Sequence, residues 1–472
     1  PTYLSYKNMG KNFEDIIKKA EKYRIKYNNT FRDKIIEDMH QQISTTLADV
    51  IQYRETNDFL GKIEKYVDLF LTSRIGGILV LTIMLSIVLW ITLLGAGYIS
   101  SLLGSFFEYI ESGLRKIFHF LKIPELITSF LIDGVYKSVA IVVAVMLPPM
   151  TIFFPLFTFL EDLGLLPRIA LNMDKIFKSV GAHGNQSLTM MVGFGCNAAG
   201  VVSTRIIKSP KERLIAILTN NFMPCNGRWP LLIMISTIFL APLISSSSNP
   251  LVGSLIASTA LVLSVFVGLV FTLIISLGLS KFLKSLGSFY ILEIPPFRKP
   301  NFLRILYTSI IDRTVFVLAR AVYMAIPAGI FVWTINQLNL SQNITNTLDP
   351  FGKLFGLDGT IILSYIIALP ANEIVIPALL MLYTGSKNFV EIEQLQSIYQ
   401  ILTVYGNWDW KTGICVMLFS ILHNPCTTTI LTIYKETQSL KWTIIATVLP
   451  LITAFSTLFI VYNLLLKHIN SL

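Results

Sequence analysis

The residues best suited to chemistry are thiols and amides that interrupt apolar stretches of this chain. Segment 191–200 contains Cys196 and Asn197 between glycines, and segment 223–228 contains Cys225 between a proline and an asparagine. Lipid cannot hydrogen-bond freed backbone groups, so a broken helix inside a membrane is tolerated only against protein or a water-filled cavity. The two segments therefore predict a substrate pathway in a protein that moves a solute across a membrane.

A carboxylate occupies a third apolar stretch. Glu373 and its neighbour Asn372 lie between two runs of aliphatic residues. A charge at the centre of a bilayer costs about 2.5–3.5 kcal/mol, so a cation, a proton or a hydrogen-bond network must offset it. We interpret Glu373 as a cation or proton site. The alternative is an ion pair with Arg228 or Arg320 that holds helices together.

Two Pro-Cys pairs, which contain Cys225 and Cys426, each place a thiol beside a helix break. Proline removes the helical hydrogen bond to the carbonyl four residues earlier, which predicts free carbonyl groups at Asn220 and Ile421. Thiolate, carboxylate, amide and carbonyl ligands together suit a divalent transition metal, whereas thiolate is a poor ligand for Na⁺ or Mg²⁺. Each cysteine taken singly is equally well explained as a small buried hydrophobic residue.

His423 precedes the second Pro-Cys pair. An imidazole inside a membrane is a candidate metal ligand or proton relay, and a hydrogen-bonded structural role is an equal alternative. Cys415 has no helix break beside it and is interpreted as packing. No catalytic or cofactor-binding residue is predicted, because phosphate-loop, metalloprotease and nucleophile-elbow motifs are absent. The predicted metal ligands are Cys196, Asn197, Cys225, Asn372, Glu373, His423 and Cys426.

These residues require an all-α, polytopic membrane scaffold. The chain is 53% hydrophobic and 14% charged, against about 25% charged residues in soluble domains. Residues 1–74 hold 13 Lys/Arg and 11 Asp/Glu, 24 of the 66 charged residues, and predict a soluble helical segment before a transport domain at 75–472. The excess of cations flanks apolar spans, as the positive-inside bias requires. We therefore expect no nucleic acid partner.

Nine apolar stretches approach the roughly 20 residues that a helical membrane span needs, namely 76–98, 138–160, 184–204, 212–240, 251–280, 314–335, 360–384, 411–434 and 442–466. All cation-rich loops lie on the cytoplasmic side of the membrane only if 184–204 and 360–384 are re-entrant hairpins, which enter the membrane and return to the same side. Seven full crossings result, with the N-terminus cytoplasmic and the C-terminus outside. Opposed hairpins are typical of an inverted repeat, so we predict gate repeats at about 138–240 and 314–434.

The motifs of this chain resemble those of the ferrous iron transport protein B (FeoB) family. The resemblance begins near Phe70 and implies uptake of Fe²⁺, as transported substrate, into a prokaryotic cell through two gate repeats. It implies that Cys196, Cys225, Cys426 and Glu373 line the path. Five motifs follow one another in family order: Phe194–Asn197 with Thr204–Arg205, Phe222–Pro230, Glu293–Pro300, Asn372–Val375 and Asn424–Thr428.

The chain departs from the family motifs at three places. Residues 198–200 read Ala-Ala-Gly in place of Val-Pro-Ala, Pro224 replaces the usual Ser, and Asn372 replaces the usual Lys. Loss of that Lys removes a partner of Glu373 and leaves the carboxylate freer to meet a cation. Mn²⁺ and Zn²⁺ therefore stay open as alternatives to Fe²⁺.

Family members usually begin with a GTPase domain joined through a GDI-like helical spacer, and residues 1–74 resemble the end of that spacer. The GTPase is expected on a preceding part of the protein or on a separate GTP-binding chain that docks on 1–74; no nucleotide site is expected here. Further implied partners are membrane lipid, small cytoplasmic accessory proteins and other copies in a homo-oligomer, at the prokaryotic cytoplasmic membrane. Two other functions remain open: an organic solute (nucleoside-like) carrier, and a non-transporting membrane scaffold that binds a GTPase.

Overall fold

The computed structural model describes residues 19, 38–39, 41–43, 45–47, 59–165, 168, 173, 176–182, 184–240, 242, 250–283, 300–338, 340–385 and 395–466. Within these ranges the regular structure is entirely helical. The chain divides into two compact units, Pro1–Tyr66 and Val67–Leu472. Most of the predicted soluble segment, and the family motif at 293–300 except for its last residue, lie outside the described residues.

Six helical stretches in the described ranges are long and apolar enough to cross a membrane. This confirms the prediction of an all-α polytopic membrane protein. The six are Thr82–Phe120, Glu125–Asp162, Val262–Phe282, Phe302–Gln337, Trp410–Thr437 and Leu440–Leu464.

The first two of these stretches form a long antiparallel pair. Helix α4 (Arg74–Phe120) is followed by α5 (Glu125–Ser129), η2 (Phe130–Tyr136) and α6 (Lys137–Asp162), and α4 packs along α6. With 47 residues at 1.5 Å each, α4 is about 70 Å long, more than twice the hydrocarbon thickness of about 30 Å. Its length therefore carries the pair well beyond a bilayer core.

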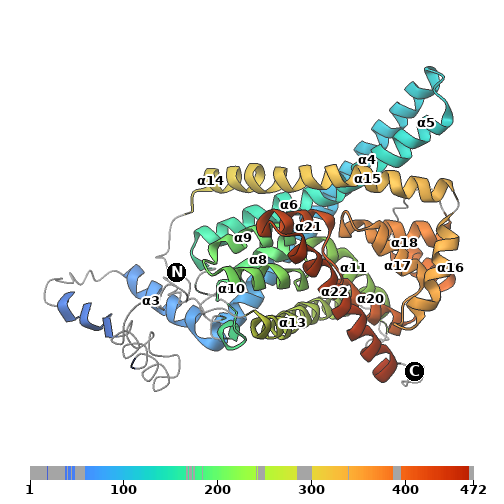
Figure 1. The fold of residues 1–472 in the computed structure, drawn as a ribbon. Helices are drawn as coiled ribbons and strands as arrows, with labels where there is room; N and C mark the ends of the chain where they lie inside the picture. Colours follow the sequence, from blue (N-terminus) through green and yellow to red (C-terminus); the bar gives the residue numbers. More distant parts are fainter. Residues whose placement is uncertain are drawn as a thin grey trace, which may run out of the picture. The chain divides into compact units, whose positions relative to one another are not determined.

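A third long helix lies against this pair. Its parts are α14 (Phe302–Tyr307), η7 (Thr308–Val315) and α15 (Phe316–Gln337), and Figure 1 shows them running beside α6. The helix α16 (Leu340–Lys353) follows and packs on α17 (Gly359–Ile367). These helices form one wall of the region in which the broken segments lie.

Both predicted hairpin segments are interrupted where the sequence contains helix breakers. Helix α8 (Gln186–Gly195) ends at Cys196, which is extended (φ −156°, ψ 123°), and α9 (Asn197–Ser203) packs back on α8. The second segment consists of α17, η8 (Asn372–Ile374) and α18 (Val375–Thr384). Ala371, just before η8, has the nearly identical torsions φ −151° and ψ 125°.

One apolar stretch, 212–240, is not a single helix, because it is broken at the first Pro-Cys pair, where the sequence predicts a helix break. Met223 is extended (φ −81°, ψ 125°), because a residue before proline is sterically excluded from the helical region. The segment therefore consists of α10 (Pro210–Thr219), η4 (Asn220–Phe222), η5 (Asn226–Arg228), α11 (Trp229–Ile235) and η6 (Ser236–Leu240).

The second Pro-Cys pair makes the corresponding break between α20 (Trp410–Leu422) and α21 (Thr427–Thr437). The remaining long helices are α13 (Pro250–Phe282) and α22 (Leu440–Ile460). Cys225 and Cys426 are both extended residues that start the next helical turn, with φ −80° and −63° and ψ 167° and 158°. The two thiols thus occupy equivalent backbone positions.

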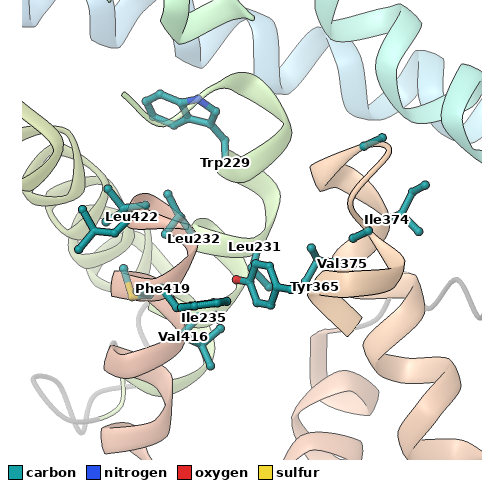
Figure 2. Packing of buried hydrophobic residues seen from close by; sticks show 14 of the residues in the cluster. Trp229, Leu231, Leu232, Ile235, Tyr365, Ile374, Val375, Val416, Phe419 and Leu422 are labelled. Atoms are coloured by element: carbon teal, nitrogen blue, oxygen red, sulfur yellow. The ribbon is translucent and has the colours of Figure 1, made fainter. Parts of the chain in front are cut away.

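Apolar side chains from three of the broken segments pack together and fix the breaks relative to one another. Helix packing in a membrane depends on such van der Waals contact rather than on exclusion of water. Tyr365 of α17 meets Phe419 of α20 edge to face, with ring centroids 4.8 Å apart. Figure 2 shows this core, which contains Trp229, Leu231, Leu232, Ile235, Tyr365, Ile374, Val375, Val416, Phe419 and Leu422.

Candidate functional site

The centre of the candidate site is the Asn372 amide, which connects a thiol to an imidazole. Its Nδ2 donates to Cys225 Sγ at 3.6 Å, and its Oδ1 lies 3.3 Å from His423 Nε2. All three side chains are buried. They come from η8, from the break before η5 and from the end of α20, so three predicted ligands meet although they are far apart in the sequence.

The hydrogen bonds of His423 determine which ring nitrogen is available. Nδ1 lies 2.9 Å from the Ser420 carbonyl and 3.1 Å from the Phe419 carbonyl. Because a carbonyl oxygen only accepts, Nδ1 carries the hydrogen, and in the neutral ring Nε2 has the lone pair. Asn372 Oδ1 is also an acceptor, so its 3.3 Å contact with Nε2 is not a hydrogen bond in this tautomer. The ring is held against Tyr365 and Phe419, at centroid distances of 4.8 and 5.7 Å. The ligand-competent nitrogen therefore faces Asn372.

Glu373 lies against the backbone of the other Pro-Cys segment. A Cβ placed on Gly227 would overlap the Glu373 carboxylate, so glycine is required for this approach. Within the described ranges no cation forms an ion pair with Glu373: Arg228 donates to backbone carbonyls and Arg320 donates to Thr432. The alternative role for Glu373, an ion pair with either arginine, is therefore not what the structure contains.

Arg228 is the residue whose role sequence reasoning missed. Its guanidinium, fully buried, donates to the carbonyls of Asn221 (3.0 Å), Ile421 (2.8 Å), His423 (3.3 Å) and Asn424 (3.3 Å). A cation at the C-terminal end of α20 is favourable, because unsatisfied carbonyls give that end a partial negative charge. The available signal was an arginine inside an apolar stretch, one helical turn after a proline.

The prediction of two free carbonyls was wrong. The Ile421 carbonyl accepts from Arg228, and the Asn220 carbonyl accepts from the Met223 backbone N–H at 3.3 Å. The breaks leave acceptors without helical partners, but buried backbone groups are nearly always paired in another way. Each of the two carbonyls therefore already accepts a hydrogen bond.

A layer of asparagine amides lies next to the first break. Asn220 Nδ2 donates to the Asn197 carbonyl at 3.0 Å, and the side chains of Asn197 and Asn221 are 3.3 Å apart. Asn221 Nδ2 donates to the His423 carbonyl at 2.7 Å, which ties this layer to the second half of the chain. Asn220 Oδ1 is buried without a hydrogen-bond partner in the described part of the molecule. Asn220 and Asn221 were not predicted as site residues.

The remaining predicted ligands border this group. Cys196 is buried at the start of α9, and Cys426 is partly exposed at the start of α21 with Sγ 3.2 Å from Thr429 Oγ1. Of the predicted ligands, Asn372 contacts both Cys225 and His423, and Glu373 lies against Gly227, two residues after Cys225.

Among the described residues, no three His, Cys, Asp or Glu side chains are close enough to form a ready metal cluster. The site instead mixes donor types, namely thiols, an imidazole, amides and a carboxylate. This donor set is typical of proteins that bind divalent transition metals rather than Na⁺ or Mg²⁺. Cys415 is fully buried and packs beside Gly356, away from this group.

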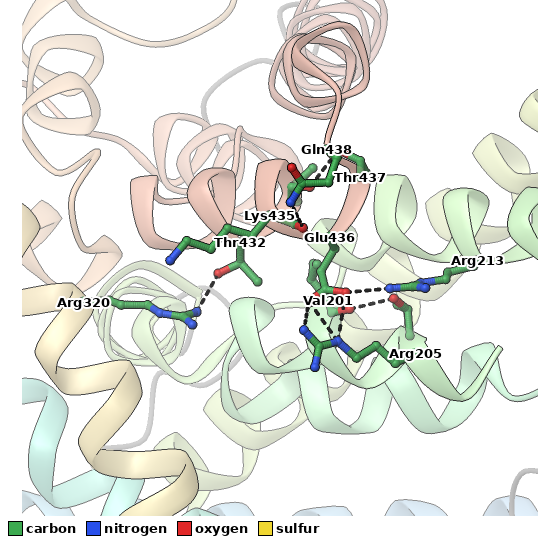
Figure 3. Close-up of polar contacts among 11 residues, drawn as sticks. Val201, Arg205, Arg213, Arg320, Thr432, Lys435, Glu436, Thr437 and Gln438 are labelled. Atoms are coloured by element: carbon green, nitrogen blue, oxygen red, sulfur yellow. Dashed lines mark hydrogen bonds and ion pairs between the residues drawn. The ribbon is translucent and has the colours of Figure 1, made fainter. Parts of the chain in front are cut away.

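An ion-pair cluster joins the residues around α9 and α10 to the end of α21, as Figure 3 shows. The Glu436 carboxylate, at the end of α21, accepts hydrogen bonds from Arg205 at 2.6 and 3.0 Å and from Arg213 at 2.6 Å. The Glu436 side chain is 4% exposed, whereas that of Arg205 is 65% exposed. The basic loop that suggested membrane orientation is therefore also an inter-segment contact.

Two family models match this chain. The Gate model, described as "Nucleoside recognition", matches residues 143–239 and 303–440. The model described as "Ferrous iron transport protein B C terminus" matches residues 261–312. Together they cover both pairs of broken helices and α13. No solved structure matches the chain.

Several relatives bear the name Fe(2+) transporter FeoB. The protein of Staphylococcus aureus (strain MSSA476) is 26% identical over 448 residues, which cover 89% of this chain and 62% of the relative. The Methanocaldococcus jannaschii protein is 26% identical over 442 residues, with coverages of 89% and 61%. The Synechocystis protein is 27% identical over 352 residues, with coverages of 73% and 54%.

The chain thus spans less than two thirds of the length of each of these three relatives. The residues matched by the Gate model contain both Pro-Cys breaks and Glu373. On the two family models, the relatives and the six apolar helices, this chain is a membrane-domain protein of the FeoB family.

Proposed function

We propose that this chain carries Fe²⁺ across a membrane between its two pairs of broken helices. The observation that carries the proposal is the contact of Asn372 with both Cys225 and His423. It joins a soft donor from one Pro-Cys segment to an imidazole from the other. The relatives' name, Fe(2+) transporter FeoB, supports iron as the substrate.

The residues that we propose to meet the ion are those with donor atoms in this region. The full set is Cys196, Asn197, Cys225, Asn372, Glu373, His423 and Cys426. Thiol and imidazole ligands favour a transition metal over Mg²⁺ or Ca²⁺. The Glu373 carboxylate, which forms no ion pair with a residue that the structure describes, supplies negative charge that attracts the passing ion. The mixed donor set suits an ion in transit better than a resident one, because binding must stay weak enough for release.

We also propose the regulation and orientation that the family resemblance implies. The two broken pairs act as inverted gate repeats, supported by the matching torsions of Cys196 and Ala371 and of Cys225 and Cys426. A GTP-binding domain or chain acts through residues 1–74, on the cytoplasmic side of a prokaryotic cytoplasmic membrane. Small accessory proteins and further copies of the chain are additional partners in this proposal.

The test is anaerobic uptake of Fe²⁺ by cells and by vesicles that contain the full protein. The double variant Cys225→Ser with Glu373→Gln should abolish uptake, and Cys415→Ser should leave it unchanged because that thiol lies away from the site. Retained uptake in the double variant would reject this site. Mn²⁺ and Zn²⁺ measured in the same vesicles determine the selectivity.

A nucleoside carrier is the second candidate function, favoured by the description of the Gate family model as "Nucleoside recognition". It predicts saturable uptake of a nucleoside that Cys225→Ser leaves intact, because a sugar hydroxyl or a base does not require a thiol. Uptake of a nucleoside and uptake of Fe²⁺, measured on the same vesicles under the same conditions, distinguish the two candidate functions. Fe²⁺ uptake without nucleoside uptake would exclude the second.

A further inference from the structure

A cleft distinct from the Asn372 group lies between α6, α15 and the α8–α9 pair. Its volume is about 400 Å³, and its walls are mainly apolar, with Phe157, Val192 and Val202 among them. Phe316 and Ile206, which also line it, are 60% and 44% exposed, so the cleft opens at the surface beside them. A mainly apolar cleft of this volume has room for part of a hydrocarbon chain.

Two arginines on the same long helix face this cleft. Arg313 donates to Glu161 Oε2 and to Thr158 Oγ1, both at 3.1 Å, so its charge is compensated. Arg320 donates to the Thr432 hydroxyl at 3.0 Å and forms no ion pair with any residue that the structure describes. Figure 3 shows this contact. The cleft therefore contains one uncompensated guanidinium.

That guanidinium belongs to a helix that is a candidate membrane span, Phe302–Gln337. An arginine within a span is costly unless it meets an anion, a carbonyl or water. Guanidinium presents five N–H donors in a planar fork that matches the geometry of a phosphate. One hydroxyl partner leaves most of these donors free, so an anion is the expected ligand.

We propose that the cleft binds an anionic membrane phospholipid. Its phosphate contacts Arg320 and the neighbouring Arg313, and one acyl chain lies against Phe157, Val192 and Val202. A free phosphate ion would satisfy the arginines but would leave the apolar walls unused. The mouth of the cleft beside the exposed ring of Phe316, on an apolar helix, gives a lipid access from the bilayer.

The position of the cleft connects this lipid to both broken pairs. Ala198 and Ala199 of α9 line the cleft and directly follow the predicted ligands Cys196 and Asn197. Thr432, the partner of Arg320, lies on α21, which begins just after Cys426. The bound lipid therefore lies against α9, which begins after Cys196, and its ligand Arg320 contacts α21, which begins after Cys426.

The test is lipid retention by the purified full protein, measured by native mass spectrometry and by the thermal unfolding midpoint in micelles. Phosphatidylglycerol should be retained in preference to phosphatidylcholine, and Arg320→Gln should reduce that preference by about tenfold, the loss of one charge-assisted contact. Lys208→Gln, an exposed lysine outside the cleft, is the matched control. Equal retention of both lipids by the unaltered protein would overturn the proposal.

A second variant keeps the test decisive if Arg320→Gln does not fold. Val202→Phe fills the cleft without a change of charge and should also reduce retention of phosphatidylglycerol. If inorganic phosphate stabilises the protein as strongly as the lipid does, the site binds an ion rather than a lipid, and the proposal fails. No iron enters these measurements, so their failure is distinguishable from failure of the Fe²⁺ proposal.

Discussion

The Nδ2 of Asn372 donates a hydrogen bond to the Sγ of Cys225 across 3.6 Å, although 147 residues separate them in the chain. The same amide meets His423 on its other side. A short uncharged side chain thus connects the two Pro-Cys segments and leaves Glu373 without a neighbouring cation among the described residues. The family motif usually has a lysine at the position of Asn372. An amide in place of that lysine leaves the neighbouring Glu373 carboxylate without this cationic partner.

Asn372→Ala should reduce Fe²⁺ uptake and also lower stability by about 1–3 kcal/mol, because the buried Cys225 Sγ then loses the hydrogen bond from Asn372 Nδ2. Uptake and the unfolding midpoint in detergent measure the two effects. Asn343→Ala, an exposed residue on α16, is the control. An Asn372→Ala protein with normal uptake would show that the amide bridge has no part in transport.

Glu373→Gln should abolish Fe²⁺ uptake without a loss of stability. The substitution keeps the shape of the side chain, breaks no ion pair among the described residues and removes the unfavourable burial of a charge. Uptake by vesicles and chemical unfolding are measured on the same preparation. A large drop in stability would instead indicate that the carboxylate has a partner on which the fold depends.

Gly227→Ala should reproduce the transport defect of Glu373→Gln, because the added Cβ overlaps the carboxylate and must displace it. The matched control is Gly97→Ala, where the structure has no atom within 4 Å of the new Cβ. Alanine at 97 should be neutral or slightly stabilising, by up to about 1 kcal/mol in a helix. Equal effects of the two variants would contradict the close packing of Gly227 on Glu373.

Glu436 and Arg213 should be energetically coupled, because they form a hydrogen-bonded pair in which the carboxylate is almost completely buried. A double-mutant cycle with Glu436→Gln and Arg213→Gln should give a coupling of about 1–3 kcal/mol in chemical unfolding. Arg205 is the internal comparison, since its exposed guanidinium should couple by about 1 kcal/mol or less. Coupling near zero for both arginines would show that the two halves are not joined here.

Local features of the sequence were sufficient to predict the helical membrane class and the positions of the breaks. Glycines near Cys196 and the proline before Ala371 weaken a continuous helix at these points, although α6 continues through three prolines. Pro224, which the sequence also marks as a helix breaker, divides 212–240, and Met223 before it is extended.

The partners of the polar groups depended on the tertiary structure. The sequence identified thiols, amides and a carboxylate as candidate ligands, because each is unusual in an apolar stretch. It did not indicate that Arg228 would occupy the carbonyl of Ile421, 193 residues away, or that Asn372 would lie between Cys225 and His423. Such contacts depend on how the broken helices pack against one another, and local residue preferences do not contain that information.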